Sequence, residues 1–231
     1  MSTLLINGCS FAECWKPSNR FQKNLQCDKL VNLGKSGTSF QRTNRSTVEY
    51  IAQNGNPDWV IIPITFLFRW ELAIGKKDNE IDGTWWPIQV VNHSIPTVAL
   101  SSSVDKKKLY KWVETYYQLI PDIRTFWDKG FTEIITLASF LEQRKINYLM
   151  FDMCNNFEKK RLANYKGFEK IKLIEQNKKI IDLFNFCGNR YMWGTMDNNS
   201  RNDIDCYAHH HNSLQYGHLE NKLIDYLQSQ R

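Results

Sequence analysis

The sequence predicts an α/β fold, a three-layer α/β/α sandwich with a mostly parallel sheet. Short apolar runs of the kind found in strands buried on both faces alternate along the chain with longer segments of helical periodicity. This alternation builds a parallel sheet with helices on both faces. Because crossover connections are right-handed, the strands then end at one common edge. The 231 residues suffice for one domain with a sizeable core, which we expect to span residues 1–231.

The individual elements follow in chain order. Four apolar runs predict strands, over residues 3–7, 29–33, 59–64 and 146–152. Apolar residues at helical spacing predict five helices, over residues 41–54, 107–120, 122–145, 169–184 and 213–229, with a candidate break in the third at Gly130. Residues 74–105 fit neither pattern and contain Gly, Pro, Ser and a pair of tryptophans. A loop of this length is either a lid or binding insertion, or a surface excursion packed down by its tryptophans.

Composition and charge argue against several classes of protein. The formal net charge is +6, but the lysines and arginines are spread along the chain without a zinc-finger or RNA-binding signature, so no nucleic-acid partner is expected. No stretch approaches the roughly 18 apolar residues of a membrane span. The six cysteines include no C-x-x-C pair, and the N-terminus carries no signal-peptide pattern. We therefore expect mostly reduced thiols and a cytoplasmic protein.

A candidate nucleophile follows the first predicted strand. The run Leu4–Phe11 breaks at Gly8 and places Ser10 at the carboxyl edge of the sheet, where open α/β folds hold their chemistry. Serine becomes a nucleophile when a base takes its proton and N–H donors stabilise the oxyanion. Four of the five histidines lie within residues 209–218, so this segment offers the base. Gly37, after the second strand, lets the backbone approach a substrate and offer an N–H.

Four short stretches together resemble the SGNH, or GDSL-type, hydrolase family. Gly8–Phe11 resembles the family's G-D-S-L block, with Cys in place of Asp, and Asn32–Gly37 resembles the second block. Pro57–Ile62 resembles the strand that leads into the third block, and His211–His218 resembles the last block. Their order and spacing cover almost the whole chain. The resemblance implies an SGNH- or flavodoxin-like sheet, with the active site at its carboxyl edge and no cofactor.

Residue by residue, the resemblance implies that Ser10 is the nucleophile and His211 the general base. The backbones of Ser10 and Gly37 would form part of the oxyanion hole. The third block departs from the family, since it lacks the Asn whose side chain donates to the oxyanion, and Thr65 or Arg69 is the candidate substitute. This form of the third block is similar to a divergent group found in phage and marine microbial genomes. It implies a viral or environmental source, and a virion location if the protein is phage-encoded.

The acid that would orient the histidine also departs from the family's spacing. The family places Asp three residues before the base, whereas Asp205 lies six residues before His211. Asp205 is the candidate acid, either with the intervening residues looped out or with His209 or His210 as the base instead. Asp152, at the end of the fourth predicted strand, is a more remote substitute. An acid steadies the imidazolium, so its loss slows the reaction without abolishing it.

These residues also have other interpretations. Ser10 is a candidate cap for a helix. Cys9 is a candidate nucleophile, although strand alternation points it into the core, where an apolar thiol is inert. The histidines with Asp205 are a candidate zinc site, but adjacent histidines do not readily converge on one ion, and our prediction is no metal.

The leading interpretation is a serine ester hydrolase that removes an acyl group such as acetyl from a carbohydrate or lipid. Its expected partner is a small-molecule or glycan ester. Arg69, Trp85 and Trp86 are the candidate substrate-binding residues, with the tryptophans as a platform for a sugar ring. The alternative is a catalytically degenerate SGNH-like protein that binds a glycan or another protein, as a virion component. A third interpretation is a structural or assembly role for a basic α/β domain. The sequence makes no prediction of the oligomeric state.

Overall fold

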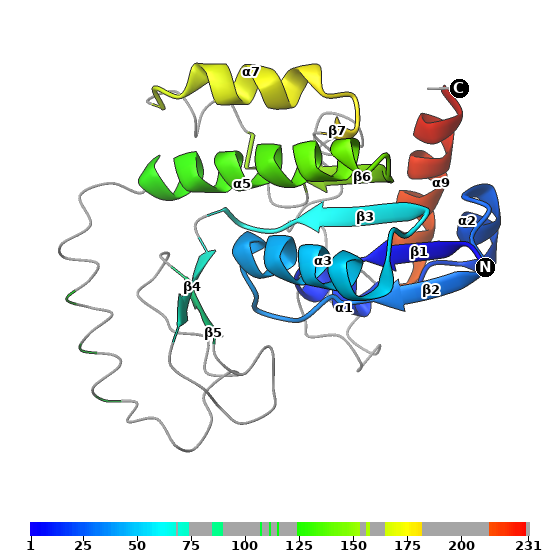
Figure 1. Cartoon of the computed structure of the whole chain (residues 1–231), viewed down its shortest axis with the longest axis horizontal. Coiled ribbons are helices and arrows are strands. Elements are labelled where there is room, and N and C mark those ends of the chain that lie inside the picture. Colours follow the sequence, from blue (N-terminus) through cyan, green and yellow to red (C-terminus); the bar gives the residue numbers. More distant parts are fainter. Residues whose placement is uncertain are drawn as a thin grey trace.

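A computed structural model of the chain describes residues 1–67, 69–73, 85–89, 107, 111, 115, 124–152, 156–157, 165–181 and 213–229. Within these residues, five strands form one sheet in the order β2-β1-β3-β6-β7 (Figure 1). Every neighbouring pair is parallel. The strands are β1 (Thr3–Ile6), β2 (Lys29–Asn32), β3 (Trp59–Ile64), β6 (Asn147–Asp152) and β7 (Ile180–Ile181).

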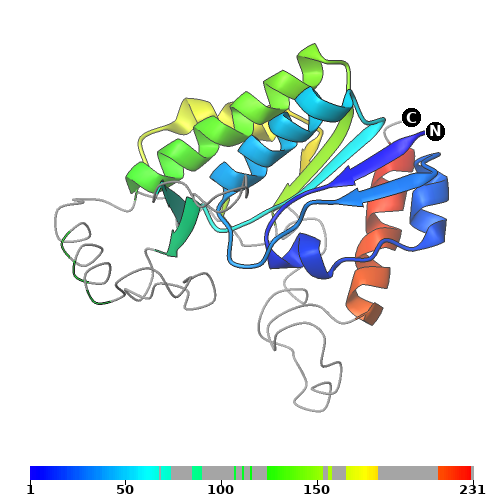
Figure 2. The same cartoon turned by 60° about the horizontal axis from the view of Figure 1, so that its bottom comes forward.

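Helices cover both faces of this sheet, which makes three layers (Figure 2). The helices on one face are α1 (Ser10–Cys14), α2 (Asn19–Asn24) and α9 (Ser213–Ser229). Those on the other face are α3 (Phe40–Asn54), α5 (Arg124–Gln143) and α7 (Phe168–Gln176). The predicted three-layer α/β/α sandwich with a parallel sheet is therefore confirmed.

The alternating faces of the strands divide the core into two halves. Along β1, Leu4 and Ile6 pack with α1, α2 and α9, whereas Leu5 packs with α3 and α5. β6 repeats this pattern, with Leu149 on the first side and Met150 on the second. All five side chains are at most 1% exposed, and full burial of each contributes about 1.5–3 kcal/mol. The continuous apolar runs are thus strands buried on both faces.

Seven predicted elements agree closely with the structure, namely four strands and the helices at α3, α5 and α9, and one predicted helix differs. The strands at β1, β2, β3 and β6 lie within one residue of their predicted bounds. The predicted helix over residues 169–184 is wrong, because α7 ends at Gln176 and the chain then forms β7. Helical spacing cannot separate these two elements, since the β-branched pair Ile180–Ile181 continues the apolar pattern of α7. Most of the predicted helix over residues 107–120 lies outside the described residues.

The helix α5 passes through Gly130 without a break. A Cβ at Gly130 would lie 2.8 Å from the Cβ of Leu67, so the glycine admits close packing against the segment after β3. Within the described residues, no helix is both long and apolar enough to cross a membrane.

A two-stranded antiparallel hairpin follows the central sheet. Its strands are β4 (Arg69–Ala73) and β5 (Trp85–Gln89), and Figure 1 shows them beyond the end of β3. The rest of the predicted insertion over residues 74–105 lies outside the described residues, so the lid interpretation stays a prediction.

Candidate active site

The chain reverses its direction across the sheet between β1 and β3. After β1 it builds β2 on one side, then crosses to β3 on the other side of β1. The segments that leave the carboxyl ends of β1 and β3 therefore diverge. Ligands of open α/β sheets bind in the crevice at such a point. Ser10 follows β1 and Thr65 follows β3, so two candidate residues lie on its two sides.

Ser10 is the first residue of α1 and is 6% exposed. The N-cap is Cys9, and its side chain makes no capping hydrogen bond, so Ser10 does not cap the helix. Within the described residues, the Ser10 hydroxyl makes no hydrogen bond to another side chain. Cys9 is a free thiol, 1% exposed and part of the core, as strand alternation predicts.

The segment after β2 is fastened to α1. Asn32 donates through Nδ2 to the carbonyl of Ala12 at 2.7 Å, and the backbone N–H of Lys35 donates to the carbonyl of Gly8 at 3.0 Å. A Cβ at Gly34 would lie 2.3 Å from the backbone nitrogen of Glu13, so only glycine admits this approach. These contacts place the second block of the resemblance directly beside the turn that carries Ser10.

Gly37 lies in the same segment with a φ of +75°, in the left-handed region that favours glycine. A Cβ built there would meet no atom within 4 Å, so space is open on that side of the backbone. Thr38 fixes the turn, because its hydroxyl donates to the carbonyl of Lys35 at 2.7 Å. The structure therefore brings Ser10 and Gly37 to the same edge of the sheet. The oxyanion role of Gly37 stays a prediction.

Thr65 is fully buried, at 0% exposed. Its hydroxyl accepts a hydrogen bond from Nη1 of Arg69 at 3.3 Å, and its carbonyl accepts one from Nδ2 of Asn156 at 3.0 Å. The guanidinium of Arg69 also lies 5.0 Å from the ring centroid of Phe66. Thr65 and Arg69 are thus neighbours after β3, and their roles in an oxyanion hole or in substrate binding stay predictions.

A buried amide and carboxylate join the loops after β3 and β6. Asn156 donates to Oδ1 of Asp152 at 2.7 Å, and its own Oδ1 accepts from the N–H of Leu67 at 3.1 Å. Asp152 is 0% exposed and also accepts from the N–H of Phe157 at 3.1 Å. Sequence reasoning missed Asn156, because a single asparagine in a loop carries no periodic signal. Asp152 therefore has a structural role, since through Asn156 it connects the loop after β6 to the loop after β3.

A second polar cluster ties the hairpin to the helices. Glu71 of β4 forms an ion pair with Arg45 of α3, at 2.7 Å between Oε2 and Nη1. The Oε1 atom of Gln41 accepts from the N–H of Glu71 at 2.8 Å, and the same side chain hydrogen-bonds to Glu133 of α5. Burial raises the pKa of Glu133, and the charge of Glu71 raises it further. The local sequence around Glu71 does not indicate this partner on α3.

The C-terminal helix is anchored beside Ser10. The hydroxyl of Tyr216 donates to the carbonyl of Phe11 at 2.9 Å, and its ring stacks on Trp15 with 6.3 Å between centroids. One turn further along, Glu220 accepts from Nε1 of Trp15 at 3.0 Å and from the N–H of Ser18 at 3.0 Å. Two segments about 200 residues apart in sequence are therefore held together at the candidate site.

Several predicted residues lie outside the described residues. They are Asp205, His209, His210 and His211, so the structure does not test the base, the acid or the zinc alternative. His218 is exposed on α9. Trp85 and Trp86 are described only as backbone of β5. Among the side chains that the structure describes, no three of the His, Cys, Asp or Glu type lie together to hold a metal.

Among the described cysteines, Cys14 differs from the reduced state expected for most of the thiols. Cys14, the last residue of α1, is disulfide-bonded, whereas Cys9 and Cys27 are free and buried. Of the three described cysteines, two are reduced, and the expectation of mostly reduced thiols stays a prediction for the whole chain.

Comparison with known proteins finds similarity of fold alone. No family model matches the chain, and no curated protein matches its sequence. A candidate acylhydrolase from Bacteroides fragilis superposes with a TM-score of 0.52 at 13% identity, over 100% of this chain and 88% of that one. The esterase EstA from Pseudoalteromonas sp. superposes with a TM-score of 0.48 at 12% identity, over 99% of this chain and 98% of that one. A G-D-S-L family lipolytic protein from Desulfitobacterium hafniense, itself a candidate assignment, gives 0.47 at 10% identity, over 98% and 99%.

Proposed function

We propose that the protein is a serine ester hydrolase with Ser10 as its nucleophile. The observation that carries the proposal is the position of Ser10. It is the first residue of the helix after β1, at the sheet's reversal point, beside the Gly37 loop and the anchored start of α9. Its hydroxyl is not used as a helix cap. A nearly buried serine whose hydroxyl neither caps its helix nor bonds another side chain among the described residues, at the edge where such folds bind ligands, is a good candidate for chemistry.

The proposed reaction has two steps. The Ser10 hydroxyl attacks the ester carbonyl while His211 accepts its proton, and the same histidine then protonates the leaving alcohol. Water hydrolyses the acyl-enzyme by the reverse proton movements, which releases the carboxylic acid and restores Ser10. The N–H groups of Ser10 and Gly37 stabilise the oxyanion, with Thr65 or Arg69 as a third donor. The first N–H groups of a helix have no partner inside that helix, so the N–H of Ser10 suits this task.

The covalent chain supports His211 as the base. It lies two residues before Ser213, the first residue of α9, and two extended residues span at most about 7 Å. Tyr216, in the first turn of the same helix, contacts the residue that follows Ser10. A histidine so close in sequence to this anchor can reach the nucleophile. His209 and His210 are the alternative bases, and Asp205 is the proposed acid.

The proposal also covers the group to which the protein belongs, its location and its substrate. The Bacteroides fragilis protein of similar fold is a candidate acylhydrolase, which agrees in class with ester hydrolysis. We propose a divergent member of the SGNH group, of phage or marine type and cytoplasmic or virion location. Its substrate would be an acylated carbohydrate or lipid, bound by Arg69 with Trp85 and Trp86.

A chromogenic ester assay tests this function. The wild type is expected to hydrolyse p-nitrophenyl acetate, and Ser10→Ala to lose at least about 10³-fold in kcat/KM. Cys9→Ala is the matched control, because Cys9 adjoins Ser10 but points into the core. Separate alanine variants of His209, His210 and His211 identify the base. Equal rates for the wild type and Ser10→Ala would contradict the proposal.

A second function has one observation in its favour. The third block lacks the usual asparagine, and Thr65 in its place is fully buried. This favours a catalytically degenerate protein that keeps the fold and binds a glycan or protein. Calorimetric titration with a set of acetylated and deacetylated xylo-oligosaccharides distinguishes the two functions. Binding of both forms without turnover, unchanged in Ser10→Ala, would favour the binding protein.

A further inference from the structure

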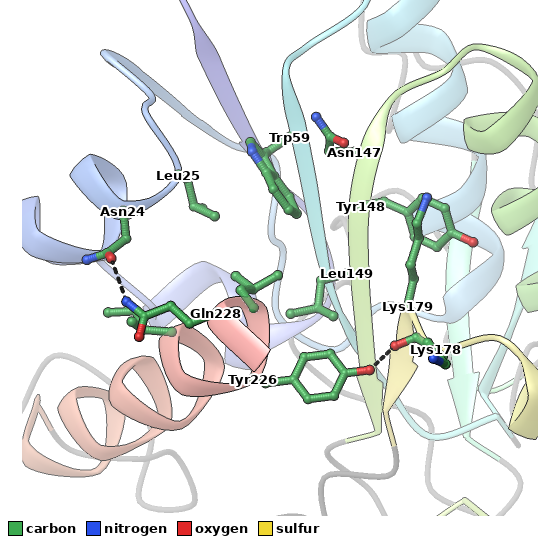
Figure 3. A pocket seen from close by; sticks show the side chains of 12 residues that line it. Asn24, Leu25, Trp59, Asn147, Tyr148, Leu149, Lys178, Lys179, Tyr226 and Gln228 are labelled. Carbon is green, nitrogen blue, oxygen red and sulfur yellow. Dashed lines mark hydrogen bonds between the residues drawn. The ribbon is translucent and has the colours of Figure 1, made fainter. Parts of the chain in front are cut away.

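A cavity of about 440 Å³ opens at the end of the molecule opposite Ser10. It lies where β3 and β6 begin, between the end of α2, the last turns of α9 and the turn before β7 (Figure 3). Ser10 follows the carboxyl end of the sheet, and β3 alone spans about 16 Å from Trp59 to Ile64. The cavity is therefore separate from the candidate active site. Its volume lies within the usual range for sites that bind small molecules, about 300–1,000 Å³.

The inner wall of the cavity is apolar. Figure 3 shows Trp59 from β3 and Leu149 from β6 facing the space beside α9. Leu25, which directly follows α2, completes this wall together with Ile224 and Leu227 of α9. The wall is firmly built, since Leu149 and Ile224 are at most 3% exposed and belong to the core. Such a surface gains free energy when it covers an aliphatic or aromatic body, at about 25 cal/mol per Å² of apolar area.

The outer part of the cavity is positively charged. Lys178 and Lys179 lie at its mouth, and its lining includes no carboxylate. Among the described residues, the Lys178 ammonium makes no ion pair, while that of Lys179 lies 4.9 Å from the ring centroid of Tyr148. The carboxylate of Glu142 nearby is used by the Tyr148 hydroxyl, at 2.6 Å. A monoanionic ligand would therefore meet two lysines and no carboxylate among the residues that line the cavity.

The mouth is also held in place by hydrogen bonds from α9. The Tyr226 hydroxyl donates to the carbonyl of Lys178, which ties the turn before β7 to the helix (Figure 3). Tyr226 crosses the space between these elements and forms one side of the cavity. The backbone around the site is consequently preformed, with the turn that carries the two lysines tied to the helix that supplies part of the apolar wall. Preformed sites of this kind lose little free energy on ordering.

We propose that this cavity binds a small amphipathic carboxylate of the fatty-acid type. The hydrocarbon chain lies against Trp59 and Leu149, and the carboxylate lies between Lys178 and Lys179. The inference is independent of the proposed hydrolase function, because no residue of the cavity belongs to the candidate active site.

Calorimetric titration with octanoate tests the inference. Octanoate is expected to bind with a stoichiometry of one. Three other ligands should bind at least tenfold more weakly: octan-1-ol because it has no charge, octylammonium because its charge is positive, and acetate because it has no hydrocarbon chain. Lys178→Met/Lys179→Met is expected to weaken octanoate binding at least tenfold. Lys166→Met/Lys172→Met is the matched control, since both lysines are exposed and lie elsewhere. Leu227→Trp, which fills the apolar wall, should abolish binding with the melting temperature unchanged.

The Ser10→Ala variant separates this cavity from the catalytic edge. It is expected to bind octanoate as the wild type does, whatever its activity toward esters. Loss of binding in Ser10→Ala would assign octanoate to the active site instead. Equal binding of octanoate and octylammonium, or unchanged binding in both the lysine pair and Leu227→Trp variants, would overturn the inference.

Discussion

The hydroxyl of Tyr216 donates a hydrogen bond of 2.9 Å to the carbonyl of Phe11, the residue that follows Ser10. The two residues are 205 positions apart and both are buried. Tyr216 lies in the first turn of α9 and Phe11 in the first turn of α1. This contact fixes the end of α9 from which the histidine segment leaves, so it links the proposed base to the proposed nucleophile.

Removing this hydrogen bond should reduce both stability and activity. Tyr216→Phe keeps the ring on Trp15 but removes the hydrogen bond to a buried carbonyl, at a cost of about 1–3 kcal/mol. Under the proposed function, kcat should fall more than KM rises, because the base loses its position. Tyr226→Phe is the matched control on the last turn of the same helix, where the hydroxyl bonds an exposed carbonyl. Equal losses of activity in both variants would argue against a link to the site.

The left-handed backbone of Gly37 provides a second prediction. Gly37→Ala and Gly55→Ala both place a side chain at a positive φ, +75° and +84°, with no atom within 4 Å of the new Cβ. Each should lose roughly 1–3 kcal/mol of unfolding free energy in urea titration. Only Gly37→Ala should reduce ester hydrolysis, by roughly tenfold or more, because its N–H is the proposed oxyanion donor. Full activity in Gly37→Ala would remove this residue from the oxyanion hole.

Close packing of the second block against α1 predicts a larger effect at Gly34. A Cβ there would lie 2.3 Å from the nitrogen of Glu13 and 2.6 Å from the carbonyl carbon of Ala12, and backbone atoms cannot move aside cheaply. Gly34→Ala should therefore destabilise the fold by about 3 kcal/mol. Gly217→Ala is the contrasting variant, since Gly217 is exposed within α9 with open space around it, and a gain of about 1 kcal/mol is expected. Similar melting temperatures for the two variants would refute this packing.

The carboxyl of Glu133 predicts a pH dependence of stability. Burial first, and then the charge of Glu71, hold its pKa above the usual value of 4.5 in the folded state. The folded state therefore binds more protons than the unfolded state between these two pKa values, so stability is lost as the pH rises through them. Glu133→Gln should remove this loss and be more stable than the wild type at pH 7. Urea unfolding between pH 4 and pH 8 should show the difference growing with pH, and a constant difference would contradict the assignment.

The sequence was sufficient for four of the five strands of the parallel sheet, because buried parallel strands have a distinct composition. Runs such as Trp59–Ile64 are too apolar and too short for surface helices, so their bounds could be predicted closely. Ser10 and Gly37 could also be predicted to lie at one edge, since both follow strands of the same direction. Short helices such as α2 could not be predicted, because six residues capped by Ser18 are too few to show helical periodicity.

The contacts that build the walls of the site could not be predicted either. Glu71 bonds Arg45 across 26 positions, and Asn156 bonds Thr65 across 91. Nothing in the local pattern around these residues names a distant partner. Such pairings depend on how helices and loops pack, which a single sequence leaves open.

The most direct test of the central claim is covalent labelling of Ser10. A fluorophosphonate reacts with serines that a neighbouring base has activated, and digestion with mass spectrometry locates the modified residue. The proposed function predicts one label, on Ser10, that is absent from Ser10→Ala and slowed in His211→Ala. A protein that is folded and remains unlabelled, or that is labelled at another residue, would contradict Ser10 as the nucleophile.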